Sequence, residues 1–153
     1  MSVGTTNMYQ WGIEHISRAT IDLDSDPFKM AWLTATYTPN ANDSVWGDIS
    51  TNEIVSGNGY SAGGANCAVN VSRVGATVTW TLSEVDWVTS GGTIPASGGP
   101  PYWWAIYSTA NKNGKNLPLL CYGLGDQTPA ALPVTQLGAT LRYIPNPNGV
   151  FTL

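Results

Sequence analysis

The sequence predicts an all-β protein, a single-domain β-sandwich or jelly-roll-like fold with a short N-terminal helix or arm. Six or more short segments have the apolar or alternating pattern of strands, and clusters of glycine, proline and asparagine separate them. The chain contains 17 glycines and 10 prolines, which suits a fold with many turns. Only 10% of its residues are charged, against about 25% in an ordinary soluble domain, so threonines supply much of the polar face of the strands.

The length of the chain fits one domain, because 153 residues can bury about two thirds of their unfolded surface without a metal or a disulfide. No internal repeat and no long linker divides the sequence. We therefore expect an N-terminal arm or short helix at 1–20, followed by one β-sandwich domain at 21–153.

The first expected element is a short helix in residues 7–18, NMYQWGIEHISR. Asn7 is expected to be its N-cap, and Arg18 lies at the far end, where the helix dipole favours a cation. Gly12 weakens the helical pattern. The apolar residues near helical spacing are Met8, Trp11 and Ile16.

The rest of the chain is predicted to form strands. The first strand-like segment, FKMAWLTATY at 28–37, is apolar on both faces, which indicates a strand covered on both sides. Turn-forming clusters such as TPNAND, NKNGKN and IPNPNG lie between the segments. The predicted strands are 28–37, 67–72, 76–82, 102–108, 117–123, 139–144 and the short C-terminal segment GVFTL.

Two of these segments show the alternation of a half-buried strand. The inward positions expected in 76–82 are Val78, Trp80 and Leu82, with threonines between them. The inward positions expected in 67–72 are Cys67, Val69 and Val71. Trp32 and Trp80 lie near strand centres and are expected in the core.

The stretch SGNGYSAGG at residues 56–64 contains four glycines, which raises the question of a ligand-binding loop. A dinucleotide fingerprint requires G-x-G-x-x-G between a strand and a helix, so that the helix N-terminus meets the pyrophosphate. Here the spacing is G-x-G-x-x-x-G, and a predicted strand follows. We therefore expect a structural turn with Tyr60 packed beneath it, whose positive-φ positions are Gly57, Gly59, Gly63 and Gly64.

No catalytic group of residues is visible in the sequence, and the protein is predicted not to be an enzyme. His15, the only histidine, follows Glu14 directly, and adjacent helix residues do not face each other. Glu84 and Asp86 share a strand face, where two carboxylates are more often solvated than catalytic. The motif H-E-x-x-H does not occur.

No metal and no cofactor are expected. The acidic run DLDSD at 22–26 matches the opening of an EF-hand loop. However, Pro27 takes the place of the turn glycine, and Leu33 that of the bidentate glutamate. We expect these carboxylates on the solvent face of a strand, with weak calcium binding as the alternative. The two cysteines, Cys67 and Cys121, lie in apolar strand-like segments and are expected to be free, buried thiols.

The charge distribution argues against two classes of partner. The formal net charge is −4 and the six lysines and arginines are scattered, whereas phosphate binding needs a basic stripe. Nucleic acid is therefore not an expected partner. Residues 87–111 carry no charge, but they contain SGGTIPASGGPP, whose glycines and prolines prevent a lipid-exposed helix. No membrane partner is expected, and no secretory signal is visible in MSVGTTNMYQ.

The segment PPYWWAIY at 100–107 is apolar on both faces. The simplest interpretation is a central strand covered on both sides. Two alternatives stay open. One is a subunit contact, because Trp and Tyr are enriched in such contacts. The other is a sugar-stacking platform built on Tyr102, Trp103 and Trp104.

The order of the segments resembles a family of small tailed-bacteriophage virion proteins, found among head decoration (cement) proteins and other minor structural proteins. The most specific match is the string V-S-G-x-G-Y-x-A-G-G in residues 55–64. Two features depart from the family pattern. The residues at 103–105 are Trp-Trp-Ala where the family has Arg followed by Tyr-Ala, and the loop SGGTIPASGGPP is longer. The stretches that carry the resemblance are 21–39, 45–50, 53–64, 86–94, 102–111, 118–127 and the Gly-Val-Phe-Thr-Leu end.

The resemblance implies a β-sandwich without enzymatic activity that binds the outside of a capsid and stabilises the shell. It also implies the major capsid protein as partner, a homo-oligomer (dimer or trimer), and a place on the capsid surface of a virion assembled in the host cytoplasm. A neck, tail or fibre position and a carbohydrate-binding module are the alternatives. The side chains expected to contact the coat protein or another subunit are Met8, Trp11, Ile16, Trp103 and Tyr107.

Overall fold

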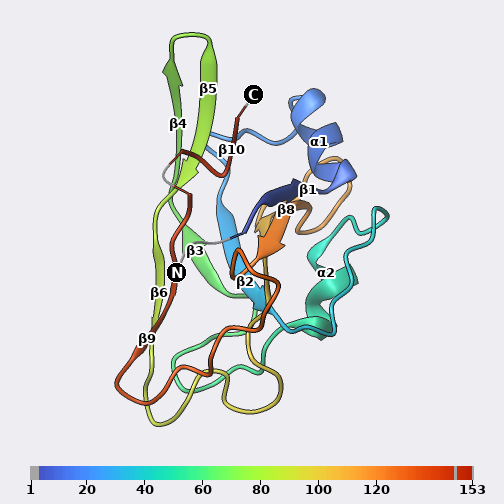
Figure 1. Ribbon diagram of the computed structural model, residues 1–153. Helices are drawn as coiled ribbons and strands as arrows, with labels where there is room; N and C mark the ends of the chain where they lie inside the picture. Colours follow the sequence, from blue (N-terminus) through green and yellow to red (C-terminus); the bar gives the residue numbers. More distant parts are fainter. Residues whose placement is uncertain (1–3, 147, 153) are drawn as a thin grey trace.

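The computed structural model describes residues 4–146 and 148–152, and within them the regular secondary structure is mostly β-strand (Figure 1). Residues 1–3 of the expected arm, Pro147 and Leu153, the last residue of the expected C-terminal strand, lie outside the described residues. The elements in chain order are β1 (Thr6–Met8), α1 (Gln10–Ser17), β2 (Phe28–Leu33), α2 (Trp46–Ile49), the 3-10 helix η1 (Ser50–Asn52), β3 (Ala65–Cys67), β4 (Val69–Val74), β5 (Thr77–Leu82), β6 (Val85–Val88), β7 (Trp103–Ser108), β8 (Leu119–Leu124), β9 (Thr140–Tyr143) and β10 (Phe151–Thr152).

The largest sheet has five antiparallel strands in the order β1-β8-β7-β2-β3. β7 lies at its centre, with Trp104 opposite Trp32 of β2 on one side and Gly123 of β8 on the other. Two smaller antiparallel sheets, β10-β5-β4 and β6-β9, form a second layer (Figure 1). The predicted all-β, sandwich-like single domain is confirmed, whereas this strand order does not by itself identify a jelly roll.

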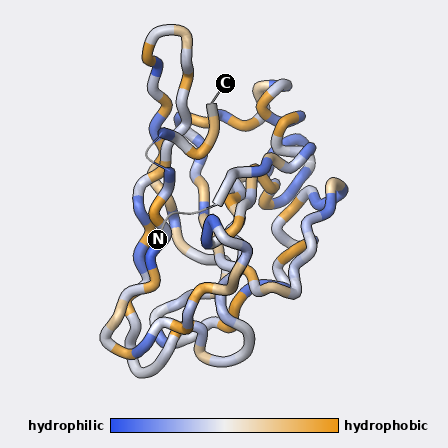
Figure 2. The backbone as a smooth tube through the Cα atoms, viewed as in Figure 1, coloured by the Kyte–Doolittle hydropathy of each residue, from blue (hydrophilic) through white to orange (hydrophobic). Residues whose placement is uncertain are grey.

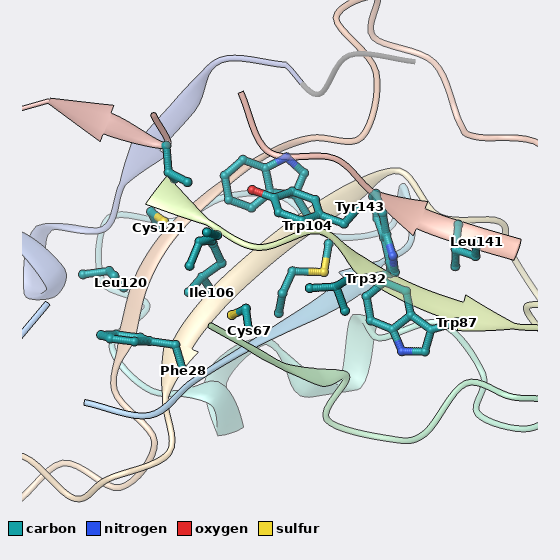
Figure 3. Close-up of a cluster of buried hydrophobic side chains, with 14 of the residues drawn as sticks. Phe28, Trp32, Cys67, Trp87, Trp104, Ile106, Leu120, Cys121, Leu141 and Tyr143 are labelled. Atoms are coloured by element: carbon teal, nitrogen blue, oxygen red, sulfur yellow. The ribbon is translucent and has the colours of Figure 1, made fainter. Parts of the chain in front are cut away.

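The main core lies between the five-stranded sheet and the second layer, and many of its side chains are aromatic (Figure 3). The Trp32 ring meets the rings of Trp87 and Tyr143 edge-on, at centroid distances of 6.4 Å and 6.3 Å. Trp104, fully buried, lies 5.4 Å from Tyr143. Such aromatic pairs contribute about 0.5–1.5 kcal/mol each beyond the area they bury. Trp32 and Trp80 are both buried, as the sequence predicts.

The opposite face of the five-stranded sheet is also covered, by Tyr9, by α2 and by the loop that precedes α2. Trp46 of α2 stacks on Tyr107 of β7, with 4.7 Å between the ring centroids and 14° between the ring planes. The hydroxyls of Tyr9 and Tyr37 lie 2.8 Å apart, and the Tyr37 hydroxyl donates to Asp43 at 2.9 Å. This second cover explains why β2 and β7 are apolar on both faces, as the sequence predicts for both segments.

The N-terminal segment differs from the prediction. Asn7 is not a helix N-cap, because it lies in β1, opposite Tyr122 of β8. The helix α1 follows Tyr9, which is extended and provides no side-chain cap. Gly12 lets the helix approach the sheet closely, since a Cβ at this position would overlap the backbone of Leu120. β1 is therefore an edge strand of the five-stranded sheet, and α1 packs against its neighbour β8.

β2 is shorter than the predicted strand 28–37. It ends at Leu33, after which the Tyr37 N–H donates to the Thr34 carbonyl at 3.2 Å in a turn. The Thr34 N–H donates to the Asn52 carbonyl at 2.8 Å. The chain therefore bends towards η1 instead of continuing along β7.

The predicted strand 67–72 is divided at Ala68, where the chain leaves β3 in the five-stranded sheet and enters β4 in the second layer. Cys67 is buried, but Val71 is exposed. The expected inward face is therefore confirmed for Cys67 and for Val69, which packs against the main core, but it is wrong for Val71, because β4 extends beyond that core.

The two cysteines, Cys67 on β3 and Cys121 on β8, are free and buried, as the sequence predicts. Both belong to the main core (Figure 3). Burial raises the pKa of the Cys67 thiol to about 12 and that of the Cys121 thiol well above its usual value. Both thiols are therefore protonated and unreactive at neutral pH.

Candidate interaction surface

The glycine-rich stretch 56–64 forms a turn packed against the rest of the chain. Its four expected turn glycines have φ angles between 71° and 127°. Gly59 and Gly64 also make close backbone approaches, since a Cβ at these positions would overlap the carbonyl oxygens of Val88 and Met30. Both the backbone conformation and the available space therefore require glycine at these two positions.

Glu53 holds this turn to the five-stranded sheet through a set of hydrogen bonds. Its Oε1 accepts from the hydroxyl of buried Tyr60 at 2.9 Å and from the Gly63 N–H at 2.7 Å. The Tyr60 oxygen accepts from the Trp32 N–H at 3.0 Å, and the Tyr107 hydroxyl donates to the Gly63 carbonyl at 2.7 Å. Burial raises the pKa of the Glu53 carboxyl. These polar groups are therefore paired with one another, and they hold the turn in place.

The acidic run at 22–26 closes a local turn. The Asp24 N–H donates to Asp22 Oδ1 at 2.9 Å, and the Asp22 N–H donates to Asp26 Oδ2 at 2.8 Å. Asp26 also forms an ion pair with Lys112, with 2.6 Å between Nζ and Oδ1. Within the described residues, no three His, Cys, Asp or Glu side chains come together as a metal site.

Glu84 and Asp86 share one arginine and do not form an acid–base pair. Arg142 on β9 donates to both carboxylate oxygens of Asp86, at 2.6 Å and 2.7 Å, across the β6–β9 pair. Its guanidinium lies 3.7 Å from the Glu84 carboxylate. All three side chains are exposed to solvent, which screens the interaction.

His15 is buried, and its Nδ1 lies 2.8 Å from the Thr20 hydroxyl oxygen. The Thr20 hydroxyl also donates to the His15 carbonyl at 3.0 Å, so this contact closes the C-terminal end of α1. The neighbouring Glu14 instead pairs with Arg18 at 2.7 Å. Burial lowers the pKa of the His15 imidazole, which is therefore neutral at neutral pH.

The aromatic strand β7 does not present an open platform. Tyr107 is 3% exposed and stacks on Trp46, which corrects the expectation of a surface contact at Tyr107, because α2 covers that face. Trp103 is half-buried, with its ring edge-on to Tyr37 at 6.2 Å. Trp104 has no exposed surface. The sugar-stacking alternative therefore loses Trp104 as a platform residue.

The expected contact residues of the N-terminal segment are partly covered by the protein itself. Met8 and Ile16 pack against the main core. Trp11 is half-buried, and the Lys115 ammonium lies 4.4 Å from the centroid of its ring. The freely exposed apolar side chain on α1 is Ile13, at 50%.

Exposed apolar side chains gather instead on the second layer. Alternation along β6 leaves Val88 64% exposed. Leu137, which is 65% exposed, lies in a turn that Thr89 holds by accepting from the Gly138 N–H at 2.8 Å. The set of exposed apolar residues beside β6 and β9 is defined here as the β6–β9 patch. Its members are Val88, Val134, Leu137 and Ile144.

A hollow of about 380 Å³ opens beside β9 within this patch. Val134 and Ile144 both line it, together with Thr140 of β9. Val88 lies opposite Thr140 in the β6–β9 pair, next to the hollow. Exposed apolar surface of this kind marks contact sites, and a hollow in it suits an apolar side chain of a partner.

The β4–β5 hairpin projects beyond the rest of the molecule (Figure 1). Residues 71–77 are all exposed, and Val74 near the end is 80% exposed. The two-residue loop Gly75-Ala76 closes the hairpin, with φ of 61° at Gly75 as in a type II′ turn. Figure 2 shows hydrophobic and hydrophilic stretches alternating along the hairpin and along the β6–β9 pair.

Comparisons of the chain with protein families, with curated proteins and with solved structures found no match. Within the described residues, no helix has both the length and the apolar character needed to cross a membrane. The capsid, oligomer and virion expectations that follow from the resemblance to phage virion proteins therefore stay predictions.

Proposed function

We propose that this chain is a non-enzymatic structural protein of a tailed-phage virion, a decoration protein that binds the outside of the capsid and stabilises the shell. The β6–β9 patch is the observation that carries the proposal. It gathers exposed apolar side chains on one layer of a chain in which only 10% of the residues are charged. The resemblance of the segment order to small phage virion proteins supplies the class of partner.

Several charged and polar side chains are bonded to other groups within the protein, which also favours a structural role. Glu53 is bonded to Tyr60 and Gly63, and Asp86 to Arg142. His15 contacts Thr20 at the end of α1. These groups support the fold, which leaves apolar contact as the chemistry that the surface offers.

A decoration protein acts through contact area and copy number. Each apolar side chain of the patch contributes roughly 1.5–3 kcal/mol if it becomes fully buried. Association itself costs about 4–15 kcal/mol, so one subunit binds weakly through this patch alone. A symmetric oligomer that spans neighbouring coat subunits engages several patches at once, and avidity then gives firm attachment.

Quantitative mass spectrometry of purified virions of the source phage tests the proposal, with this chain measured against the major coat protein. One copy per coat subunit, or a simple fraction of it, supports the decoration role. A handful of copies per particle would instead place the chain at the neck, the tail or a fibre. Absence from the virion would contradict all of these positions.

A further inference from the structure

β4 ends its sheet with a free edge. In the order β10-β5-β4, β5 is paired on both sides, whereas among the described residues β4 is paired on one side only. Every residue of β4 after Val69 is exposed. Across the described residues, the backbone of Val69, Val71 and Arg73 forms no hydrogen bond outside the β4–β5 pair.

The hydrogen-bonding pattern fixes which residues face this edge. In an antiparallel pair, alternate residues turn both their N–H and their C=O towards the same neighbour. At the base of the hairpin, the Ser83 N–H donates to the Ala68 carbonyl at 2.9 Å. At its end, the two-residue turn pairs Val74 with Thr77. The even-numbered residues therefore face β5, and the outward backbone groups belong to Val69, Val71 and Arg73.

The edge lacks several features by which exposed strands avoid pairing. Such strands usually carry proline, lysine or a bulge. β4 contains no proline or lysine, and its register with β5 is regular along all six residues. Arg73 is its one charged residue, and residues 69–82 contain no Asp or Glu, although the net charge of the chain is −4. Two hairpins can therefore approach without bringing carboxylates together.

We propose that this edge pairs with the β4 edge of a second copy of the same chain, in antiparallel register about a twofold axis at Val71. The two three-stranded sheets then form one continuous sheet. This register places Val69 opposite Arg73 of the second copy and opposes no like charges. The pairing is independent of the virion assignment, since it rests on β4 alone.

Charge complementarity favours a second copy as the occupant. Val71 lines a shallow hollow that Asp22 and Asp24 also line. Val69, Val71 and Arg73 share this side of the strand, because side chains alternate along it. The proposed register brings the arginine of each copy beside Val69 of the other, on the side where the two carboxylates lie. The symmetric pair therefore forms this contact between opposite charges twice.

Two measurements on the purified full chain test the pairing. Hydrogen exchange is followed by NMR at micromolar and at millimolar concentration, and sedimentation equilibrium gives the oligomeric state. We expect a dimer at high concentration, and exchange of the Val69, Val71 and Arg73 amides slower by about tenfold or more. The Asn70 and Ser72 amides, already bonded to β5, should change less. A monomer at every concentration, or a dimer with unchanged Val71 exchange, would overturn the proposal. Protection that appears only on particles would assign the edge to another protein.

The variant Val71→Pro removes the outward N–H on the twofold axis without removing a hydrogen bond to β5. Val71→Ala is the matched control, because it shortens the same side chain and keeps the N–H. We expect the proline variant to raise the dimer dissociation constant at least about tenfold and the alanine variant to raise it less. Equal effects of the two would show that the backbone edge is not the contact.

The variant Arg73→Glu provides a second test that does not alter the backbone. It places a carboxylate beside Asp22 and Asp24 of the second copy and should weaken the dimer. Adding Asp24→Arg to the same chain should restore the dimer, which general destabilisation of the hairpin would not do. Thermal unfolding of each variant checks that the fold is kept. Persistence of the dimer in both Arg73→Glu and Val71→Pro would overturn the proposal.

Discussion

The Glu53 carboxylate accepts a hydrogen bond from the Tyr60 hydroxyl at 2.9 Å, and this contact fixes the glycine turn on the five-stranded sheet. The same oxygen accepts from the Gly63 N–H at 2.7 Å. Two donors thus depend on one acceptor, and the buried Tyr60 hydroxyl is shielded from water. We therefore expect the turn to depend on the presence of this side-chain oxygen more than on its charge.

Two substitutions of Glu53 separate the effect of its hydrogen-bond acceptor on stability from the effect of its negative charge. Glu53→Leu removes the acceptor, so we expect the free energy of unfolding to fall by about 1–3 kcal/mol. Glu53→Gln keeps an oxygen in place and should change it by less than about 1 kcal/mol. Urea denaturation of both variants measures the difference. Equal losses in the two variants would mean that the negative charge itself holds the turn.

The pKa of Glu53 also predicts a pH dependence. Burial raises this pKa above the value of 4.5 expected for an unfolded glutamate. The folded state therefore keeps the Glu53 proton to a higher pH than the unfolded state does. The contribution of Glu53 to stability is full below pH 4.5 and is lost as the pH rises through the folded-state pKa. Relative to Glu53→Gln, the wild type should lose stability between pH 4.5 and neutral pH. Parallel stability curves of the two proteins would contradict the raised pKa.

His15 predicts a loss of stability in acid. Burial lowers its pKa below the value of 6.5 for an unfolded histidine, and the positive charges of Lys115 and Arg18 act in the same direction, against Glu14. The contribution of His15 to folding stability is full above pH 6.5 and is lost as the pH falls through the folded-state pKa of His15. His15→Gln should flatten this part of the curve, as measured by unfolding at a series of pH values. An unchanged slope would assign the acid sensitivity to other groups.

Alanine substitutions at Gly64 and Gly114 can be compared to measure the stability cost of the close backbone approach at Gly64. Both have positive φ, 71° and 75°, but a Cβ at Gly64 would overlap the Met30 carbonyl oxygen, whereas space around Gly114 is open. Gly114→Ala should cost about 1–2 kcal/mol, from backbone conformation alone. Gly64→Ala should cost more than about 4 kcal/mol, or prevent folding. Similar melting temperatures for the two variants would contradict the close approach.

The β6–β9 patch predicts which surface changes reduce binding to particles. Val88→Lys and Leu137→Lys each place a charge in the proposed contact and should lower occupancy on purified capsids at least about tenfold. Val55→Lys is the control, because Val55 is 44% exposed and lies outside the patch. Titration of capsids with each folded variant measures occupancy. A larger loss with Val55→Lys would place the contact elsewhere.

The sequence predicts those parts of the fold that depend on local pattern. Trp80 and Leu82 are buried as the alternation in β5 predicts, because this strand has a core on one side. The apolar faces of β2 and β7 indicate a cover on both sides, but not its identity. Part of that cover is α2, which has four residues and therefore no visible helical period. For this reason the sequence leaves open whether Tyr107 contacts a partner or the protein itself, and in the structure it packs on Trp46.

Contacts between distant parts of the chain leave little local signal. Asn7 has the chemistry of an N-cap, yet its strand pairing with Tyr122 determines its conformation. Val71 follows the alternation of its segment, but the hairpin carries it beyond the core. The β6–β9 patch joins Val88 to residues that follow Leu132, so its apolar members are not adjacent in sequence.

The buried positions of Cys67 and Cys121 give the native chain a kinetic reporter. A thiol reagent reaches either sulfur only when its surroundings open, so the rate of modification follows the opening. Cys67 lies on an edge strand of the five-stranded sheet, and Cys121 lies on an inner one. Equal rates would mean that the two sheet layers separate as one cooperative unit. Faster labelling of Cys67 would mean that β3 detaches first, while the centre of the sheet stays closed.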